Sequence, residues 1–159
     1  MSLIRVYVIA AVAFGLDRLS KLWIVHWLDL INIRVIEVYP PYLTFVMGWN
    51  TGVNFGLFKD GGETMRWVLI AITLIVCAGL TWWARGKSSL PLQLGIGMII
   101  GGALGNGWDR LTYGAVADYL NMSCCGLRNP YTFNVADIFI FAGAALIIVV
   151  GDRTQTKTT

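Results

Sequence analysis

Four long apolar stretches constrain this chain more than any other feature of its sequence. They span residues 3–27, 67–84, 90–108 and 133–150 and make up about half of the 159 residues. A helix needs about 20 mostly apolar residues to cross the hydrocarbon core of a bilayer. The sequence therefore predicts an α-helical membrane protein with four transmembrane helices, organised as a single domain over residues 1–159.

The composition excludes an ordinary soluble domain. Hydrophobic residues make up 57% of the chain and charged residues 13%, against about 45–50% and about 25% in typical soluble domains. A small globule has too little interior to hide so much apolar surface. The net charge of +3 is also too small for the broad basic face of a nucleic-acid binder, so we expect no nucleic-acid partner.

Lysine and arginine near the ends of the stretches predict the orientation in the membrane. If all four stretches cross the bilayer, five cations fall close to the ends on one side: Arg5, Arg85, Lys87, Arg153 and Lys157. The other side has as many, but they are spread over longer segments. Because cytoplasmic segments are enriched in these residues near the span ends, we expect both termini to lie in the cytoplasm.

The segment 29–66, between the first two stretches, has the period of a β-strand at its start. Apolar and polar residues alternate from Ile31 to Val35, and this alternation is typical of a half-buried strand. After Pro40 and Pro41, residues 42–49 predict a second strand. We expect a small β-sheet lying on the outer surface of the membrane, and an irregular outer segment over residues 109–132.

The third stretch contains glycines at regular spacing. Gly97, Gly101 and Gly105 follow one another at intervals of four residues and so share one face of a helix. Small residues at this spacing let two helix backbones approach closely in a membrane. We expect this face to pack against another helix of the same chain.

Polar residues gather at the outer boundary of the predicted membrane region, where buried charge is costly and usually functional. They are Asp17, Lys21, Asn50, Asn54, Asn106, Asp109, Arg110, Asp118, Asn134 and Asp137. Their convergence predicts a functional site. Asp17 and Lys21 are four residues apart and can pair on one helix face, and such a pair could also serve only to tie helices together.

Asp118 and Asp137 could form a catalytic pair. If Asn134 caps the fourth helix, Asp137 lies in its first turn, where backbone amides favour a negative charge. Two carboxylates in a site of low dielectric constant cannot both ionise cheaply, so one stays protonated. Such a pair hydrolyses a peptide bond with no metal and no cofactor. The alternatives left open are that Asp137 only caps the helix and that Asp118 is an ordinary loop acid.

Other catalytic chemistries have weaker support. A Ser–His–Asp triad would require His26, the only histidine, and no serine has the flanking pattern of a nucleophile elbow. The three cysteines, Cys77, Cys124 and Cys125, together with His26 supply too few ligands for a zinc site. Their odd number and spacing predict no disulfide framework.

Five short blocks, in order along the chain, resemble the bacterial lipoprotein signal peptidase family, also called signal peptidase II. They are DRLSK at 17–21, NTGVNF at 50–55, GGALGNGWDR at 101–110, VADY at 116–119 and FNVAD at 133–137. Each block alone is weak, whereas five in order on four predicted spans are specific.

The resemblance implies an aspartic intramembrane peptidase of the bacterial inner membrane, active at the periplasmic face. It implies that Asp118 and Asp137 are the catalytic pair. It also implies supporting or substrate- and inhibitor-binding roles for Asp17, Lys21, Asn50, Gly52, Asn106, Asp109, Arg110 and Asn134.

The resemblance further implies the molecules that this chain meets. The substrate would be a prolipoprotein already modified with diacylglyceryl, cut just before the lipidated cysteine. Membrane lipids would surround the enzyme, and the cyclic peptide globomycin would inhibit it. One chain supplies every residue of the predicted site, so we expect a monomer.

Three positions depart from the family pattern. Asn54 stands where alanine is expected, Gly56 where serine is usual, and Tyr119 where phenylalanine is more usual. The first two lie in the loop 50–58, which we expect to cover the site as a lid does. None of the three changes either aspartate.

Two functions of other classes remain as alternatives. A small proton-coupled transporter or channel subunit could use Asp17, Asp118 and Asp137 as a relay, and a non-enzymatic assembly factor could recruit a partner through the glycine face. Transporters with inverted repeats should have related halves. The two halves of this chain share no obvious pattern, and the carboxylates gather on one side, which favours the peptidase.

Overall fold

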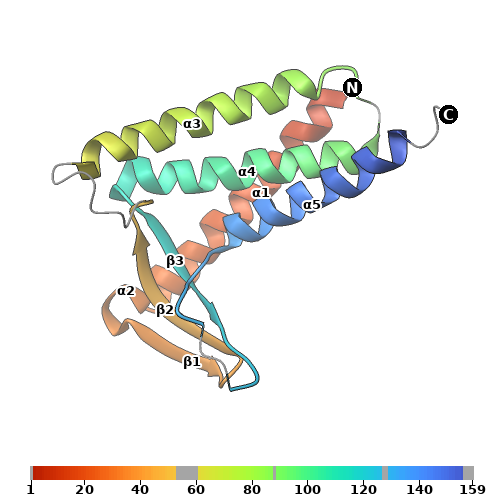
Figure 1. Cartoon of the computed structure of the whole chain (residues 1–159). Coiled ribbons are helices and arrows are strands. Elements are labelled where there is room, and N and C mark those ends of the chain that lie inside the picture. Colours follow the sequence, from red (N-terminus) through yellow and green to blue (C-terminus); the bar gives the residue numbers. More distant parts are fainter. Residues whose placement is uncertain (1, 53–60, 88, 127–128, 156–159) are drawn as a thin grey trace.

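Four long helices and a small antiparallel sheet make up the computed structural model, which describes residues 2–52, 61–87, 89–126 and 129–155. The long helices are α1 (Ser2–Lys21), α3 (Gly61–Trp83), α4 (Leu90–Tyr113) and α5 (Val135–Gln155). Figure 1 shows the sheet at one end of the helical bundle and both chain termini at the other end. Each of the four predicted apolar stretches overlaps one of these helices, with ends that differ by up to six residues.

Membrane crossing by four helices is not established by length and composition alone. Among the described residues, only α3 contains a stretch long and apolar enough for a span, Gly62–Trp83, and the apolar part of α5, Val135–Val150, is shorter. The first helix is interrupted by Asp17, Arg18 and Lys21, and α4 is rich in glycine. The charged residues of α1 and the glycines of α4 lower the apolar content of these two helices. Both sets of residues make contacts between helices, as described below.

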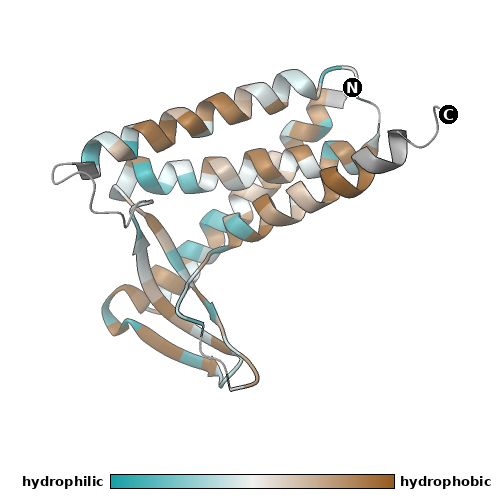
Figure 2. Ribbon diagram, in the orientation of Figure 1, coloured by the Kyte–Doolittle hydropathy of each residue, from teal (hydrophilic) through white to brown (hydrophobic). Residues whose placement is uncertain are grey.

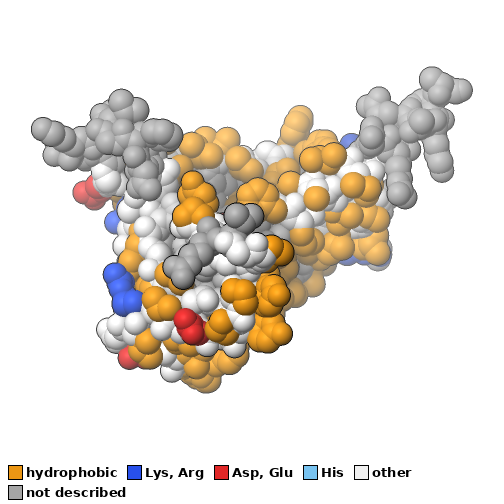
Figure 3. Space-filling view, turned by 60° about the horizontal axis from the view of Figure 1, so that its bottom comes forward, with side chains coloured by type: hydrophobic (Ala, Val, Ile, Leu, Met, Phe, Trp, Pro, Cys, Tyr) orange, Lys and Arg blue, Asp and Glu red, His pale blue; other side chains and the backbone are white. Residues whose placement is uncertain are grey.

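The outer surface of the bundle is largely apolar. Ile75 on α3, Phe141 on α5 and Ile148 on α5 are each about 70% exposed, at 69%, 74% and 71%. Figure 2 shows hydrophobic residues along the middle of the helices and hydrophilic ones near the sheet, and Figure 3 shows hydrophobic side chains over much of one face. Apolar surface of this extent indicates contact with lipid or with another apolar surface.

Helix α4 lies between α1 and α5 because glycines on two of its faces admit the neighbouring backbones. A Cβ atom at Gly101 would lie 2.4 Å from the carbonyl oxygen of Ala10 on α1. On the other face, a Cβ atom at Gly102 would lie 2.5 Å from the carbonyl oxygen of Ala136 on α5. The predicted packing of the glycine face against another helix is confirmed, and a second glycine face does the same.

The sheet contains three strands in the order β1-β2-β3: β1 (Val35–Tyr39), β2 (Leu43–Asn50) and β3 (Val116–Met122). Both neighbouring pairs are antiparallel. The prediction of an irregular segment over 109–132 was therefore wrong, because β3 lies within it. This strand forms its backbone hydrogen bonds with β2, about 70 residues earlier in the chain. The local sequence around β3 cannot show that it has such a partner.

The predicted start of the first strand was also wrong. Residues Leu30–Ile33 form a short helix, α2, and β1 begins only at Val35. The backbone has positive φ angles at Asp29 (56°) and Arg34 (71°), on either side of α2. Leu30 is fully buried, and the chain forms a helical turn around it. The alternation of apolar and polar residues over this short segment could not distinguish that turn from a strand.

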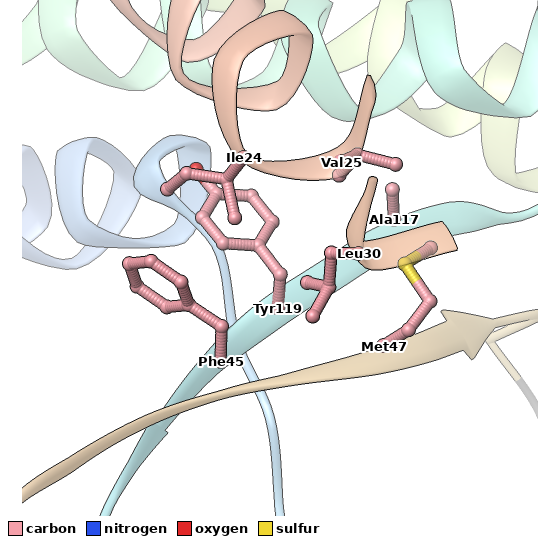
Figure 4. Packing of buried hydrophobic residues seen from close by; sticks show 7 residues of the cluster. All are labelled: Ile24, Val25, Leu30, Phe45, Met47, Ala117 and Tyr119. Carbon is pink, nitrogen blue, oxygen red and sulfur yellow. The ribbon is translucent and has the colours of Figure 1, made fainter. Parts of the chain in front are cut away.

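A hydrophobic core fixes one face of the sheet. After α1 the chain continues into the π-helix η1 (Leu22–Trp27), which covers the sheet together with α2. The buried side chains, shown in Figure 4, are Ile24, Val25, Leu30, Phe45, Met47, Ala117 and Tyr119. Ala117 and Tyr119 point into this core. Since successive side chains of a strand alternate between its faces, Asp118 points to the opposite face.

Candidate active site

Asp118 lies on β3, directly opposite Gly48 of β2. The pairing between the strands shifts by one residue between Phe45 and Gly48, as in a β-bulge, which commonly re-aims a side chain next to a site. Gly48 also makes room, because a Cβ atom there would lie 2.6 Å from Oγ1 of Thr132. The Asp118 side chain is nearly enclosed, and the residue is only 3% exposed.

Two asparagine side chains donate hydrogen bonds to the Asp118 carboxyl. Nδ2 of Asn50 lies 3.0 Å from Oδ2, and Nδ2 of Asn134 lies 2.6 Å from Oδ1. Burial raises the pKa of Asp118 from the ordinary 3.8 to about 6, with the negative charge of Asp137 adding to the rise. The two asparagine hydrogen bonds and the charge of Lys21 oppose it. A proton therefore stays on this carboxyl to a higher pH than on an exposed aspartate.

Asp137 and Asn134 cap the first turn of α5. The Asp137 N–H donates to Oδ1 of Asn134 at 3.0 Å, and the Asn134 N–H donates to Oδ2 of Asp137 at 3.2 Å. This reciprocal pattern satisfies two backbone donors that a helix start would otherwise leave free. The predicted capping by Asn134 is confirmed, and it holds the Asp137 carboxylate at the end of α5 that faces the sheet.

Asn106 and Asn134 connect the two aspartates. Nδ2 of Asn106 donates to Oδ1 of Asp137 at 2.8 Å, while Oδ1 of Asn106 accepts a bond of 3.1 Å from Nδ2 of Asn134. The same Asn134 nitrogen reaches Asp118. Side chains from β3, α4 and the start of α5 thus form one continuous polar cluster, and it contains both aspartates singled out in the sequence.

A cavity of about 320 Å³ opens beside Asp118. It lies between the end of β2 and the segment that precedes α5, and its lining residues are Gly48, Trp49, Asn50, Thr51, Gly52, Asp118, Pro130, Tyr131 and Thr132. Asp118 faces this space directly, whereas Asp137 is not part of its lining. Trp49, Tyr131 and Thr132 had no recognisable signal as site residues. Trp49 reaches the opening because β2 pairs with β3, and Tyr131 and Thr132 reach it because Phe133 bridges to Leu120 of β3.

Gly52 and Arg110 lie at the edge of the cluster nearest α3. Gly52 has a φ of 88°, and its N–H donates to Oδ1 of Asn50 at 2.9 Å. A Cβ atom on Gly52 would lie 2.4 Å from Cδ1 of Leu69 and 3.8 Å from Nη2 of Arg110. Arg110 also donates from Nη1 to the carbonyl oxygen of Asn106 at 3.5 Å. Glycine at position 52 thus lets the chain turn tightly beside the arginine.

Asp17, Lys21 and Asp109 form a buried ionic cluster behind the aspartates. Nζ of Lys21 lies 2.9 Å from Oδ2 of Asp17 and 2.7 Å from Oδ2 of Asp109. The predicted pairing of Asp17 with Lys21 is confirmed. Arg18, which the sequence did not single out, forms a second ion pair with Asp109. The only indication of Arg18 in the sequence was its position within the DRLSK block at 17–21.

The other singled-out residues lie elsewhere. Asn54 and Gly56 fall among residues 53–60, outside the described part of the chain, as does most of the loop expected to act as a lid. All three cysteines are free thiols, with Cys77 buried and Cys124 and Cys125 exposed. Within the described ranges, no three His, Cys, Asp or Glu side chains gather as a candidate metal site.

Comparison with known proteins identifies the relatives of this chain. A family model described as signal peptidase (SPase) II matches residues 9–151. The lipoprotein signal peptidase of Methylorubrum extorquens is 41% identical over 150 residues, covering 94% of this chain and 86% of the relative. That of Rhodopseudomonas palustris is 36% identical over 152 residues, covering 93% and 92%. None of these relatives supports the transporter alternative.

Solved structures share the fold. A bacterial membrane enzyme solved by the in meso method at 2.3 Å resolution has a TM-score of 0.77 and 24% identity, covering 97% of this chain and 91% of its own. A second, at 1.9 Å, has a TM-score of 0.75 and 25% identity, covering 91% and 90%. The composition and these neighbours agree that this chain is a membrane protein. Since the family model spans most of its length, the chain belongs to the signal peptidase II family.

Proposed function

We propose that this chain is an aspartic endopeptidase that removes the signal peptide from diacylglyceryl-modified prolipoproteins, cutting just before the lipidated cysteine. Its family and its named relatives support a peptidase that acts on prolipoproteins. One observation carries the mechanism: Asp118 and Asp137 belong to a single cluster, joined through Asn134 and Asn106 beside a cavity.

The two carboxyls take different parts in this proposal. Asp137, in the first turn of α5, lies where backbone amides favour a negative charge, and it accepts a proton from the attacking water. Asp118 holds its proton up to about pH 6, because burial raises its pKa to about 6, and it donates that proton to the carbonyl oxygen of the scissile bond.

The reaction is then completed by proton return. Oxygen of the water forms a bond to the carbonyl carbon and gives a neutral tetrahedral intermediate. As the carbon–nitrogen bond breaks, Asp137 passes its new proton to the leaving amine. Asp118 recovers a proton from the hydroxyl as the carboxyl product forms. Both carboxyls end in their starting states, so neither a metal nor a covalent intermediate is required.

We further propose that α1, α3, α4 and α5 all span the bacterial inner membrane as one integral domain. They contain 20, 23, 24 and 21 residues, which at about 1.5 Å per residue gives about 30–36 Å, close to the thickness of a bilayer core. Both termini lie at the end away from the sheet (Figure 1). With the cations near that end, this favours cytoplasmic termini and a periplasmic site.

The position of the site suits a lipidated substrate. The acyl chains of such a substrate stay in the bilayer while its scissile bond meets Asp118 at the outer boundary. Exposed apolar residues on the sheet, such as Val38 (46%) and Tyr39 (66%), support a sheet that lies on the membrane surface. One chain supplies the whole cluster, which favours a monomer. By its family resemblance we also propose globomycin as an inhibitor that enters the cavity.

Cleavage of a lipidated prolipoprotein by the purified protein in detergent tests the function. We expect Asp118→Asn and Asp137→Asn each to lower kcat by at least about 100-fold, the usual contribution of a proton-transferring group. Asp29→Asn is the matched control, because Asp29 is exposed and its carboxylate accepts a hydrogen bond from Asn32, which is outside the cluster. Parental activity in either active-site variant would refute the aspartate pair.

A further inference from the structure

Lys21 is buried between two carboxylates behind the site. It is only 2% exposed, and Asp17 and Asp109 are fully buried. Its ammonium lies 2.9 Å from Oδ2 of Asp17 and 2.7 Å from Oδ2 of Asp109. Burial of an ion pair carries a desolvation penalty that often cancels its attraction. Stability alone is therefore a weak reason for this cluster, since glycines already pack α4 against α1.

The carboxylates of Asp17 and Asp109 each also accept a hydrogen bond from a backbone N–H next to one of the site aspartates. Oδ1 of Asp17 accepts the N–H of Ala136 at 3.1 Å, and Oδ2 of Asp109 accepts the N–H of Ala117 at 3.1 Å. Ala136 directly precedes Asp137, and Ala117 directly precedes Asp118. Each of the two aspartates of the site is thus anchored through the preceding peptide.

A third contact from the same helix fixes the other side of Asp118. The hydroxyls of Ser20 and Tyr119 are 2.6 Å apart, and the Ser20 hydroxyl donates to the carbonyl oxygen of Asp17 at 2.8 Å. The carboxylate of Asp17 fits against α4 because position 105 is glycine, where a Cβ atom would lie 2.6 Å from Oδ2 of Asp17. The last turn of α1 therefore holds the peptide before Asp137 through Asp17, and the side chain after Asp118 through Ser20.

We propose that Lys21 is a positioning residue of the peptidase, which joins Asp17 to Asp109 and thereby sets the separation of Asp137 and Asp118. This inference rests on the proposed function. Of the three asparagines that bond the aspartates, Asn50 lines the cavity that substrate and water must enter. The connection through Lys21 is fully buried, so it can persist through the reaction. A misplacement of about 1 Å in a reacting group can lower a rate by about 100-fold.

The charge of Lys21 supplies an independent readout. Burial raises the pKa of Asp118, and the ammonium of Lys21 opposes that rise, as do the hydrogen bonds from Asn50 and Asn134. Asp137 and Arg110 also act on Asp118 through their charges, and both stay unchanged when only Lys21 is replaced. Loss of the ammonium should therefore move the fall in activity at high pH to a higher pH.

Lys21→Met is the primary test, measured as kcat and KM per folded enzyme on a lipidated prolipoprotein. Gln93→Met is the matched control, because Gln93 is also on a long helix, 1% exposed, and holds one backbone oxygen, that of Lys87, away from the site. We expect at least a tenfold lower kcat for Lys21→Met, with KM within twofold and the high-pH limb shifted upward. Gln93→Met should keep both constants within twofold.

A second variant guards against a folding defect. Lys21→Met leaves Asp17 as an unpaired buried charge, whereas Asp17→Asn combined with Lys21→Met removes both charges and keeps an oxygen for the Ala136 N–H. We expect the double variant to unfold near the parental temperature and still to show at least a tenfold lower kcat. A parental kcat in the double variant would overturn the proposal. Failure of the parent enzyme itself to cleave would instead refute the proposed function.

Discussion

Asp118 has its raised pKa because β3 places it, next to Gly48 of β2, on the face of the sheet away from η1 and α2, where it is only 3% exposed. The same aspartate on an exposed loop would have an ordinary pKa. Asn50 and Asn134 donate to its two oxygens, so the carboxyl is held in one orientation at the cavity. The position of Asp118 in the sheet thus raises its pKa and also fixes the orientation of its carboxyl.

The pH dependence of cleavage follows from this residue. The proposed mechanism requires a protonated Asp118, so kcat should fall as the pH rises through about 6, the raised pKa of that carboxyl. Asn50 opposes the rise, so Asn50→Ala should shift the fall to higher pH. Both profiles can be measured in one assay, and a profile flat from pH 5 to 8 for the parent would contradict the assignment.

Stability should follow the same group with a sign that can be worked out. The folded carboxyl binds its proton more tightly than the unfolded chain does, because its pKa is raised. Its contribution to stability is therefore complete below about pH 4 and is lost as the pH rises through about 6. Thermal unfolding of Asp118→Asn should lack this component, so its unfolding temperature should vary less with pH than that of the parent.

Gly52 allows a second test at the scale of one residue. Alanine at its φ of 88° is strained by about 1–2 kcal/mol, and the new Cβ atom would meet Leu69 beside the cavity. We expect Gly52→Ala to lower kcat/KM by about 10- to 100-fold. Gly126→Ala has a similar φ of 79° with nothing within 4 Å, so it should lose comparable stability but keep its activity.

At the scale of elements, α4 organises the bundle. Its glycines meet α1 and α5 backbone to backbone, and its last turns carry Asn106 and Asp109 to the site. The close approach also matters for the site, since Lys21 of α1 can reach Asp109 of α4 only if these two helices are nearly in contact. Helix packing and site geometry therefore depend on the same small residues.

Replacement of one of these glycines tests that dependence. A Cβ atom at Gly101 would lie 2.4 Å from a backbone oxygen of α1, which cannot move aside as a side chain can. Gly101→Ala should lower the free energy of unfolding by about 1–3 kcal/mol and reduce activity. Gly79→Ala is the control, because nothing lies within 4 Å of its Cβ position, and it should add about 0.5–1 kcal/mol. Thermal unfolding in detergent compares them.

At the scale of the whole molecule, the sheet, the cavity and the helix ends that carry the polar cluster lie together, and both termini lie at the opposite end (Figure 1). An even number of crossings follows if the long helices all span the bilayer. The exposed apolar side chains along them support that topology. The chemistry would then occur at one membrane boundary, where lipidated substrates and water meet.

The free cysteines provide a test of this topology. Cys124 and Cys125 are exposed on the sheet side, and Cys77 is buried among the helices. A membrane-impermeant maleimide added to intact spheroplasts should label the Cys77→Ala variant. It should not label a variant in which all three cysteines are alanine and Ser89, in the link between α3 and α4, is replaced by cysteine. The opposite labelling pattern would reverse the proposed orientation.

The sequence by itself determined the elements whose signals are local. Runs of apolar residues predicted the four long helices, glycines at intervals of four predicted the packed face of α4, and Asn134 three residues before Asp137 predicted the cap of α5. Each signal lies within a few turns of one helix, because periodicity and capping depend on neighbours along the chain. Family resemblance added the pair of aspartates, which local pattern had left open.

Only the tertiary structure decided what depends on distant partners. Strand β3 exists because it pairs with β2, and α2 replaces the expected strand because Leu30 is buried under the sheet. The anchoring of Ala136 by Asp17 joins residues 119 positions apart, and the pairing of Arg18 with Asp109 joins residues 91 apart. Such contacts form when helices and strands pack, so no short stretch of sequence contains them.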